Sequence, residues 1–154
     1  MKFKKKRMKY TSKKTLHSKL EGYEDVAFTL KKMAEGRRVA LNMSLADAKA
    51  TLRDLIAESQ TILPDTPEGQ VAPPIDPAQF AKYQTLSDRI NTLVEKDINM
   101  AWLRWGLDSI TGLEIDGQPC TVETLISDGP PELFAEILTA IRSEAELSTE
   151  ARKN

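Results

Sequence analysis

Residues 76–106, DPAQFAKYQTLSDRINTLVEKDINMAWLRWG, contain the most regular helical pattern in the chain. Asp76 is a preferred N-cap residue, and Pro77 is preorganised for the first helical position. Apolar residues then recur at short steps, and Gly106 supplies a left-handed C-terminal stop. The pattern predicts one helix over 78–105 whose apolar stripe another segment must cover. The stripe consists of Phe80, Tyr83, Leu86, Ile90, Leu93, Val94, Ile98, Ala101, Trp102 and Trp105.

Residues 36–59 carry a second helical pattern, in which apolar residues recur at steps of mostly three and four. We expect this helix to pack antiparallel to the helix over 78–105, because each has an apolar face to bury. Residues 61–77 lie between them and hold five of the eight prolines, which interrupt helices and remove hydrogen-bond donors from sheets. This composition predicts a mobile surface loop.

The remaining β-structure is predicted from two stretches. Residues 25–31 alternate apolar and polar side chains, which indicates a half-buried strand. Residues 113–120 predict a hairpin, because Asp116-Gly117 suits a type I′ turn. Two strands alone are marginally stable, so we expect residues 25–31 to join the hairpin in a three-stranded antiparallel sheet.

Two helices are predicted after the hairpin: a short one capped by Thr121 and a last one that begins at Pro131. The expected fold is therefore mainly α, of the α+β class. It combines a long antiparallel helical hairpin, a small antiparallel β-sheet and the C-terminal helices. At 154 residues, we expect one helical domain over 20–154 behind a basic, disordered tail over 1–19.

The tail concentrates positive charge. Residues 1–19 hold nine Lys and Arg and no acid, whereas the other 135 residues hold 13 basic and 23 acidic side chains, a net charge of −10. One interpretation is a nucleic-acid arm, because neutralised phosphates release counterions. Another is a solvated tail that rests on the acidic body. A translation start at Met8 would remove the densest block. The candidate arm residues are Lys4, Lys5, Lys6 and Arg7.

Composition also bears on the compartment. No run of 18 apolar residues occurs, so a membrane-spanning helix is not expected. The basic N-terminus lacks the apolar stretch of a signal peptide. Cys120 is the only cysteine, so no internal disulfide forms and a reducing cytoplasm is expected.

The sequence offers little for catalysis. His17 and Cys120 are the only histidine and cysteine and show no metal-ligand spacing. The glycines match no phosphate-binding fingerprint. Glu132 and Glu136 share a helical face, but such pairs are common on acidic surfaces. We therefore expect a protein that is not an enzyme, with no catalytic residue, cofactor or metal.

Trp102 and Trp105 are the only tryptophans and lie three residues apart at the end of the predicted helix. One interpretation is that both pack beneath the hairpin as core residues. The other is an exposed aromatic anchor for a protein partner, because tryptophan is enriched at binding hot spots. With Phe80 and Tyr83 of the same helix, they are the candidate protein-interaction residues.

Two stretches resemble a family of small proteins from phage and prophage genomes. Residues 26–41, VAFTLKKMAEGRRVAL, resemble the family's extended segment and paired-arginine helix start. Residues 102–154 contain a tryptophan-glycine helix end, the GLEIDG hairpin, the pattern LI-x-x-GP-x-EL-x-x-EI and a closing LS-x-E-x-x-KN. The resemblance covers about residues 20–154, with the proline-rich loop least constrained, and the basic tail lies outside it.

Genes of this kind lie among tail-morphogenesis genes, where small helical proteins are commonly tail assembly chaperones. The resemblance implies a non-catalytic factor in the bacterial host cytoplasm that binds the tape measure protein or tail tube proteins during assembly. The family pattern assigns no residue to a role. The alternatives are a DNA-binding accessory or regulatory protein that uses the basic arm, and a minor structural component of the tail. Self-association remains open, and neither nucleic acid nor a membrane is the expected partner.

Overall fold

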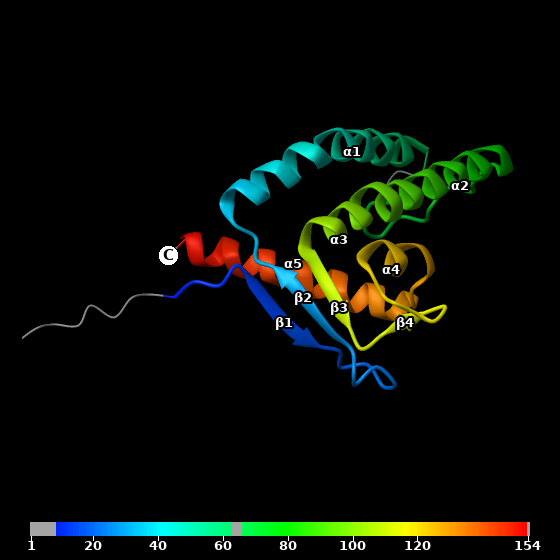
Figure 1. The fold of residues 1–154 in the computed structure, drawn as a ribbon. Coiled ribbons are helices and arrows are strands. Elements are labelled where there is room, and N and C mark those ends of the chain that lie inside the picture. The colour runs from blue at the N-terminus through cyan, green and yellow to red at the C-terminus, as the bar shows by residue number, and fades with distance from the viewer. Residues whose placement is uncertain (1–8, 63–65, 154) are drawn as a thin grey trace, which may run out of the picture. The chain divides into compact units, whose positions relative to one another are not determined.

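The computed structural model describes residues 9–62 and 66–153, most of which are helical (Figure 1). Helices together with short antiparallel strands confirm the expected mainly α, α+β class. The chain divides into two compact units. The sheet unit comprises Met1–Arg37 and Leu103–Asn154, and the hairpin unit comprises Arg38–Trp102. The single domain expected over 20–154 stays a prediction.

The sheet unit contains a three-stranded antiparallel sheet in the order β1-β2-β3. Its central strand, β2 (Ala27–Lys31), alternates between half-buried and buried side chains, as the sequence predicts. The predicted pairing of this strand with the hairpin is wrong: β2 pairs with β1 and with β3 (Leu107–Thr111). The physical reason is that Leu107 and Ile110, directly after the tryptophans, are buried and complete the apolar face.

The first strand, β1 (Lys13–His17), corrects the prediction that residues 1–19 are a disordered tail. Its side chains are mostly exposed, so no apolar alternation marks it in the sequence. It is held by antiparallel pairing with β2, in which Lys13 lies opposite Lys31 and His17 opposite Ala27. Backbone hydrogen bonds, which need no particular side chain, therefore order this part of the basic segment.

The predicted hairpin forms a sheet of its own, β4 (Glu114–Ile115) with β5 (Gln118–Pro119). Asp116 has φ 52° and Gly117 has φ 76°. Positive φ at both central residues is the requirement of a type I′ turn, so the predicted turn is confirmed.

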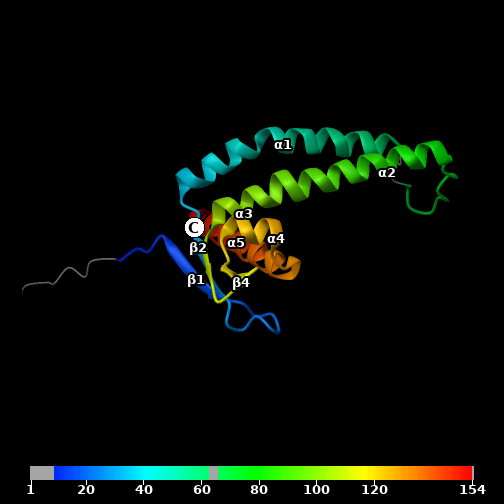
Figure 2. The same cartoon turned by 45° about the vertical axis from the view of Figure 1, so that its right-hand side comes forward.

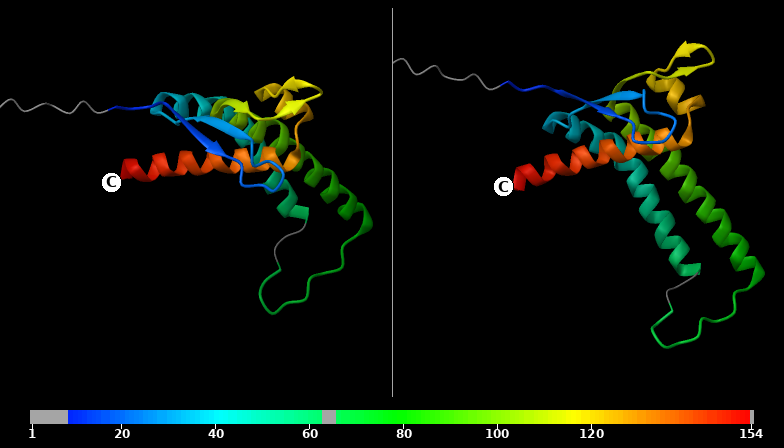
Figure 3. Two further views of the ribbon diagram at one scale, coloured as in Figure 1. Left: turned by 60° about the horizontal axis from the view of Figure 1, so that its bottom comes forward. Right: turned by 90° about the horizontal axis from the view of Figure 1, so that it is seen from below.

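The C-terminal helices are those that the sequence predicts. α4 (Val122–Asp128) begins with Thr121, whose side chain accepts a hydrogen bond from the Thr124 amide. α5 (Pro131–Lys153) lies along one face of the three-stranded sheet (Figures 1 and 3). Its buried face consists of Leu133, Ile137 and Ile141.

In the hairpin unit, α1 (Glu35–Ile62) runs antiparallel to α2 (Pro77–Thr92), as expected (Figures 2 and 3). Asp76 has an extended backbone and accepts a hydrogen bond from the Ala78 amide at 3.3 Å, which confirms the predicted N-cap. α1 extends to Ile62, beyond the predicted end at residue 59. Among the described residues, those buried in this unit are Leu41, Leu45, Leu55, Leu86 and Ile98.

The single helix predicted over 78–105 contains a π-helical segment. α2 is followed by η1 (Leu93–Asn99) and then by α3 (Met100–Gly106). Leu93 and Val94 are consecutive and both half-buried. A wider π turn keeps both on the apolar side and brings Ile98 back to it, which an unbroken α-helix would not do as well.

The loop predicted over 61–77 begins later than expected, because residues 61 and 62 belong to α1. Residues 66–76 contain no helix or strand, and their side chains are exposed. The predicted mobility of the loop stays a prediction, and residues 63–65 lie outside the described residues.

Gly106 ends α3 for a different reason from the one predicted. Its φ is not in the left-handed region. Instead, it is buried, and a Cβ placed on it would lie 2.4 Å from Cγ2 of Ile141. The glycine is required by close packing of α5 against the end of α3 rather than by a left-handed C-cap.

Across the residues that the structure describes, no helix combines the length and apolar character that crossing a membrane requires.

Candidate functional site

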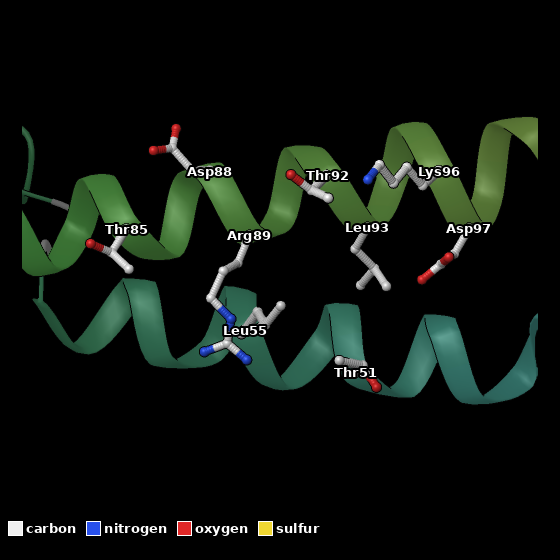
Figure 4. Close-up of a pocket in the computed structure, with 9 residues that line it drawn as sticks. All are labelled: Thr51, Leu55, Thr85, Asp88, Arg89, Thr92, Leu93, Lys96 and Asp97. Atoms are coloured by element: carbon white, nitrogen blue, oxygen red, sulfur yellow. The ribbon is translucent and has the colours of Figure 1, made fainter. Parts of the chain in front are cut away.

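A groove runs between the two long helices of the hairpin unit (Figure 4). Its volume is about 470 Å³. Leu55 of α1 and Leu93 of η1 supply apolar surface, and Figure 4 shows Leu93 pointing toward α1. Arg89 reaches across to α1 beside Leu55, whereas Asp88 points away from α1. The rest of the lining is Thr51, Thr85, Thr92, Lys96 and Asp97.

A second groove of about 510 Å³ adjoins the first, and Thr85 and Arg89 line both. Glu58, Thr61 and Ile62 border it from α1. From α2 it is lined by Ala78, Ala81, Lys82 and Leu86. The two grooves are neighbours along the hairpin, and we call them together the hairpin groove.

The hairpin groove has the composition of a protein-binding surface. The lining of the first groove is mostly apolar, that of the second is mostly polar, and the rims carry hydroxyl groups and charges of both signs. Arg89, Lys96 and Lys82 form no ion pair with any residue in 9–62 or 66–153. Such surfaces bind an amphipathic helix by covering its apolar side and pairing its flanking charges.

The predicted interaction residues Phe80 and Tyr83 both belong to α2. Phe80 is 47% exposed, which is high for an aromatic side chain, and Tyr83 is half-buried. Phe80 is thus accessible to a partner, whereas Tyr83 is largely covered within the protein.

The two tryptophans belong to different units: Trp102 ends the hairpin unit, and Trp105 lies in the sheet unit. Both are half-buried. Trp105 is engaged by Arg37, whose guanidinium donates a hydrogen bond to the Trp105 carbonyl and lies 5.4 Å from the centroid of the ring. Its packing against Arg37 favours a structural role for Trp105.

The candidate arm residues Lys4, Lys5, Lys6 and Arg7 lie outside the described residues. The following part of the basic segment is bound to the body of the sheet unit. Lys13 pairs with Asp108 at 3.1 Å, and Lys14 pairs with Glu144 at 3.2 Å. These contacts favour the interpretation in which the basic segment rests on acidic residues of the same chain.

A row of glutamates on α5 holds the connection between β1 and β2. Glu136 accepts hydrogen bonds from the Ser18 hydroxyl at 2.6 Å and the Lys19 amide at 2.8 Å. Glu132 accepts one from the Tyr23 hydroxyl at 2.7 Å. This bond lowers the pKa of Glu132 and raises the pKa of Tyr23. The carboxylates that share this helical face therefore bind the chain's own N-terminal segment.

Cys120 lines a separate cavity of about 370 Å³ between β3 and α4. It is 5% exposed, and burial raises the pKa of its thiol. The sulfur donates to the Thr121 carbonyl at 3.4 Å and accepts from the Thr124 hydroxyl at 3.8 Å. A buried thiol with a raised pKa is a weak nucleophile, which fits a packing role.

Glu123 at the edge of the same cavity pairs with Arg104 at 3.0 Å, and this pair lowers the pKa of Glu123. Across the described part of the chain, no group of three or more His, Cys, Asp or Glu side chains is placed to hold a metal ion.

Sequence reasoning selected aromatic residues and missed the hairpin groove. The sequence feature that could have indicated this groove is a polar pattern beside the apolar stripe of the helix over 77–106. Lys82, Thr85, Arg89, Thr92 and Lys96 recur at steps of three and four residues, so they share one helical face. A polar face of this kind is normally interpreted as solvated, which is why it did not stand out.

Comparison with known proteins finds no family model that matches the chain, and no curated protein or solved structure that is similar to it.

Proposed function

We propose that this chain is a non-catalytic assembly factor for a phage or prophage tail, acting in the bacterial host cytoplasm. Its partner is the tape measure protein or a tail tube protein, which it binds before the virion is complete. Residues 26–41 and 102–154, which resemble the family of small tail-region proteins, support this assignment. The role requires a binding surface rather than a reaction centre.

The observation that carries the proposal is an exposed apolar surface on α1. Val39 is 48% exposed and Met43 is 75% exposed, and at four residues apart they lie on the same face. Leu41 and Leu45, on the opposite side of the helix, are 0% and 1% exposed. A helix that is apolar on two sides has a second surface to bury, which a partner protein can cover.

The surface suits a largely helical client. An amphipathic client helix can lay its apolar residues on Val39 and Met43, and Phe80 of α2 adds a further exposed anchor in the same unit. Shielding of this kind keeps a long apolar client soluble until it is assembled.

The test is coexpression with a phage tape measure protein, with the soluble client fraction and the copurified complex as readouts. The proposal predicts that the full chain raises client solubility and forms a complex. Met43→Lys should abolish both effects while the far-ultraviolet circular dichroism stays unchanged. Val71→Lys is the matched control, because Val71 is 95% exposed in the loop and should be neutral.

Two outcomes would redirect the assignment. Recovery of the chain in finished particles would indicate a structural tail component, because a chaperone leaves before completion. Salt-sensitive DNA binding that is lost when Lys4, Lys5, Lys6 and Arg7 are replaced by Ala would indicate a nucleic-acid accessory protein.

A further inference from the structure

The hairpin unit carries two charged stripes of opposite sign. On α1, the acidic stripe repeats at steps of four and three residues: Asp47, Thr51, Asp54, Glu58 and Thr61. On α2 and η1, the basic stripe repeats at steps of three and four: Lys82, Thr85, Arg89, Thr92 and Lys96. All ten side chains are exposed. Each stripe follows the repeat by which a helix presents one face to another helix.

The stripes form the two rims of the hairpin groove. Thr51, Glu58 and Thr61 line it from α1, and all five members of the basic stripe line it from the other side. Asp47 and Asp54 belong to the same helical face as Thr51. The α1 side of the groove is therefore lined by an acid, Glu58, and by no base, whereas the other side is lined by Lys82, Arg89 and Lys96 together with Asp88 and Asp97.

The two helices are antiparallel, so residue numbers rise along α1 in the direction in which they fall along α2. The grooves show this alignment: Thr51 and Thr92 line the first, and Thr61 and Lys82 line the second. The same alignment places Asp54 level with Arg89. Extended by one repeat, it places Asp47 level with Lys96. Acidic positions of α1 and basic positions of α2 and η1 thus lie at matched heights along the hairpin.

These charges are not used within the chain. Among residues 9–62 and 66–153, Asp47 and Asp54 form no ion pair with Arg89, Lys96 or any other base. They are therefore available to charges brought by a second molecule.

A second copy of this chain supplies the matching charges. When two hairpins meet groove to groove about a two-fold axis parallel to their helices, α1 of each copy lies over α2 of the other. Asp54 then meets Arg89 of the copy, and Asp47 meets Lys96. A two-fold axis perpendicular to the helices would instead place acid on acid and base on base. The charge pattern therefore selects one arrangement.

We infer that the hairpin groove is a homodimer interface. Two copies close it and form a four-helix bundle in which every helix is antiparallel to both neighbours. The bundle covers the half-buried Leu93, buries the threonine hydroxyls and pairs acids of one copy with bases of the other. This inference does not depend on the proposed assembly function.

Sedimentation equilibrium of the full chain between about 1 and 200 μM measures the association directly. The wild-type chain should be a dimer whose dissociation constant rises with salt, because its charge pairs are screened. Asp54→Lys and Arg89→Glu should each weaken the dimer roughly tenfold or more, because each change creates two repulsive contacts. Arg53→Glu is the matched control, since Arg53 lies beside Asp54 but outside the acidic stripe.

A mixing experiment separates contacts between chains from contacts within a chain. The Asp54→Lys and Arg89→Glu chains should each be mostly monomeric, and an equimolar mixture should form heterodimers, because both contacts become attractive again. A pair within one chain cannot be restored by mixing. A monomeric wild-type chain throughout the concentration range would overturn the inference, as would a dimer that both substitutions leave unchanged. A monomer that binds a designed amphipathic helix in this groove would assign the surface to a foreign partner instead.

Discussion

Arg37 of α1 donates a hydrogen bond to the main-chain carbonyl of Trp105 in α3, and its guanidinium lies 5.4 Å from the centroid of the Trp105 ring. Trp105 precedes the last residue of α3, so its carbonyl belongs to the negatively polarised end of that helix. The Nε atom of Arg37 is buried and finds no acceptor within the described residues. The guanidinium therefore acts through its terminal nitrogen and the ring. This contact joins the start of one helix to the end of another, 68 residues apart.

Arg37→Ala removes both the hydrogen bond to the Trp105 carbonyl at the end of α3 and the cation–π contact with the Trp105 ring. We expect a loss of about 1–2 kcal/mol in the free energy of unfolding, measured by urea denaturation with tryptophan fluorescence. Arg37→Lys should lose less, because it keeps the charge near the helix end. Arg53→Ala provides the comparison at an exposed arginine of the same helix. Equal stability of all three variants would exclude the capping role.

Gly106→Ala introduces a Cβ that would lie 2.4–2.9 Å from three side-chain carbons of Ile141. Because Ile141 is 3% exposed and β-branched, it has little room to move. The variant should lose about 1–3 kcal/mol in thermal or urea unfolding.

Ile141→Ala in the Gly106→Ala background should cost less than it does in the wild-type chain, which a double-mutant cycle measures. Gly36→Ala is the control, because a Cβ at this helical position meets nothing within 4 Å. Additive effects of the two substitutions would show that the contact does not determine the need for glycine.

Tyr23→Phe removes the hydrogen bond to Glu132 and with it a pH-dependent contribution to stability. The bond lowers the pKa of Glu132 below its unfolded value, so its contribution is present above that value and is lost as pH falls through the folded pKa. It also raises the pKa of Tyr23, so the contribution is lost again when pH rises through that raised value.

The wild type should therefore be more stable than Tyr23→Phe near neutral pH, by a small amount because both groups are exposed. Urea denaturation measured from about pH 3 to about pH 8 should show the difference in stability between the two proteins shrinking as the pH falls. Tyr10→Phe, at a tyrosine 74% exposed, should show no such difference. A difference in the free energy of unfolding that stays the same at every pH would show that the ionised carboxylate of Glu132 does not contribute to it.

Cys120 should react slowly with thiol reagents in the folded protein. Burial raises its pKa, so less thiolate is present at a given pH, and the reagent also has little access to a sulfur in a residue 5% exposed. Disulfide-exchange reagents should modify it at least about tenfold more slowly than they modify the urea-unfolded chain. Equal rates in the two states would mean that the cavity beside α4 opens readily.

The candidate site shows where sequence reasoning stops. Phe80 was selected as a candidate from its place on the helix, but the same periodicity put it on the stripe that must be covered, and only the structure shows that it is 47% exposed. The hairpin groove was missed because its rims are polar, and a polar helical face has the same pattern whether it faces water or a second chain. The antiparallel alignment, which sets Asp54 level with Arg89, is what supports the second of these.

Local signals in the sequence determined the helices, the Asp76 cap and the Asp116-Gly117 turn, because each depends on hydrogen bonds and side-chain spacing within a few residues. The tertiary structure alone decided the strand at 13–17, the partners of β2, the π-helical turn and the reason for Gly106. These features depend on groups far apart in the chain: a strand with exposed side chains forms where a neighbour offers backbone partners, and a glycine is needed where another helix approaches. These contacts between distant segments are determined by tertiary packing, and no short stretch of sequence encodes them by itself.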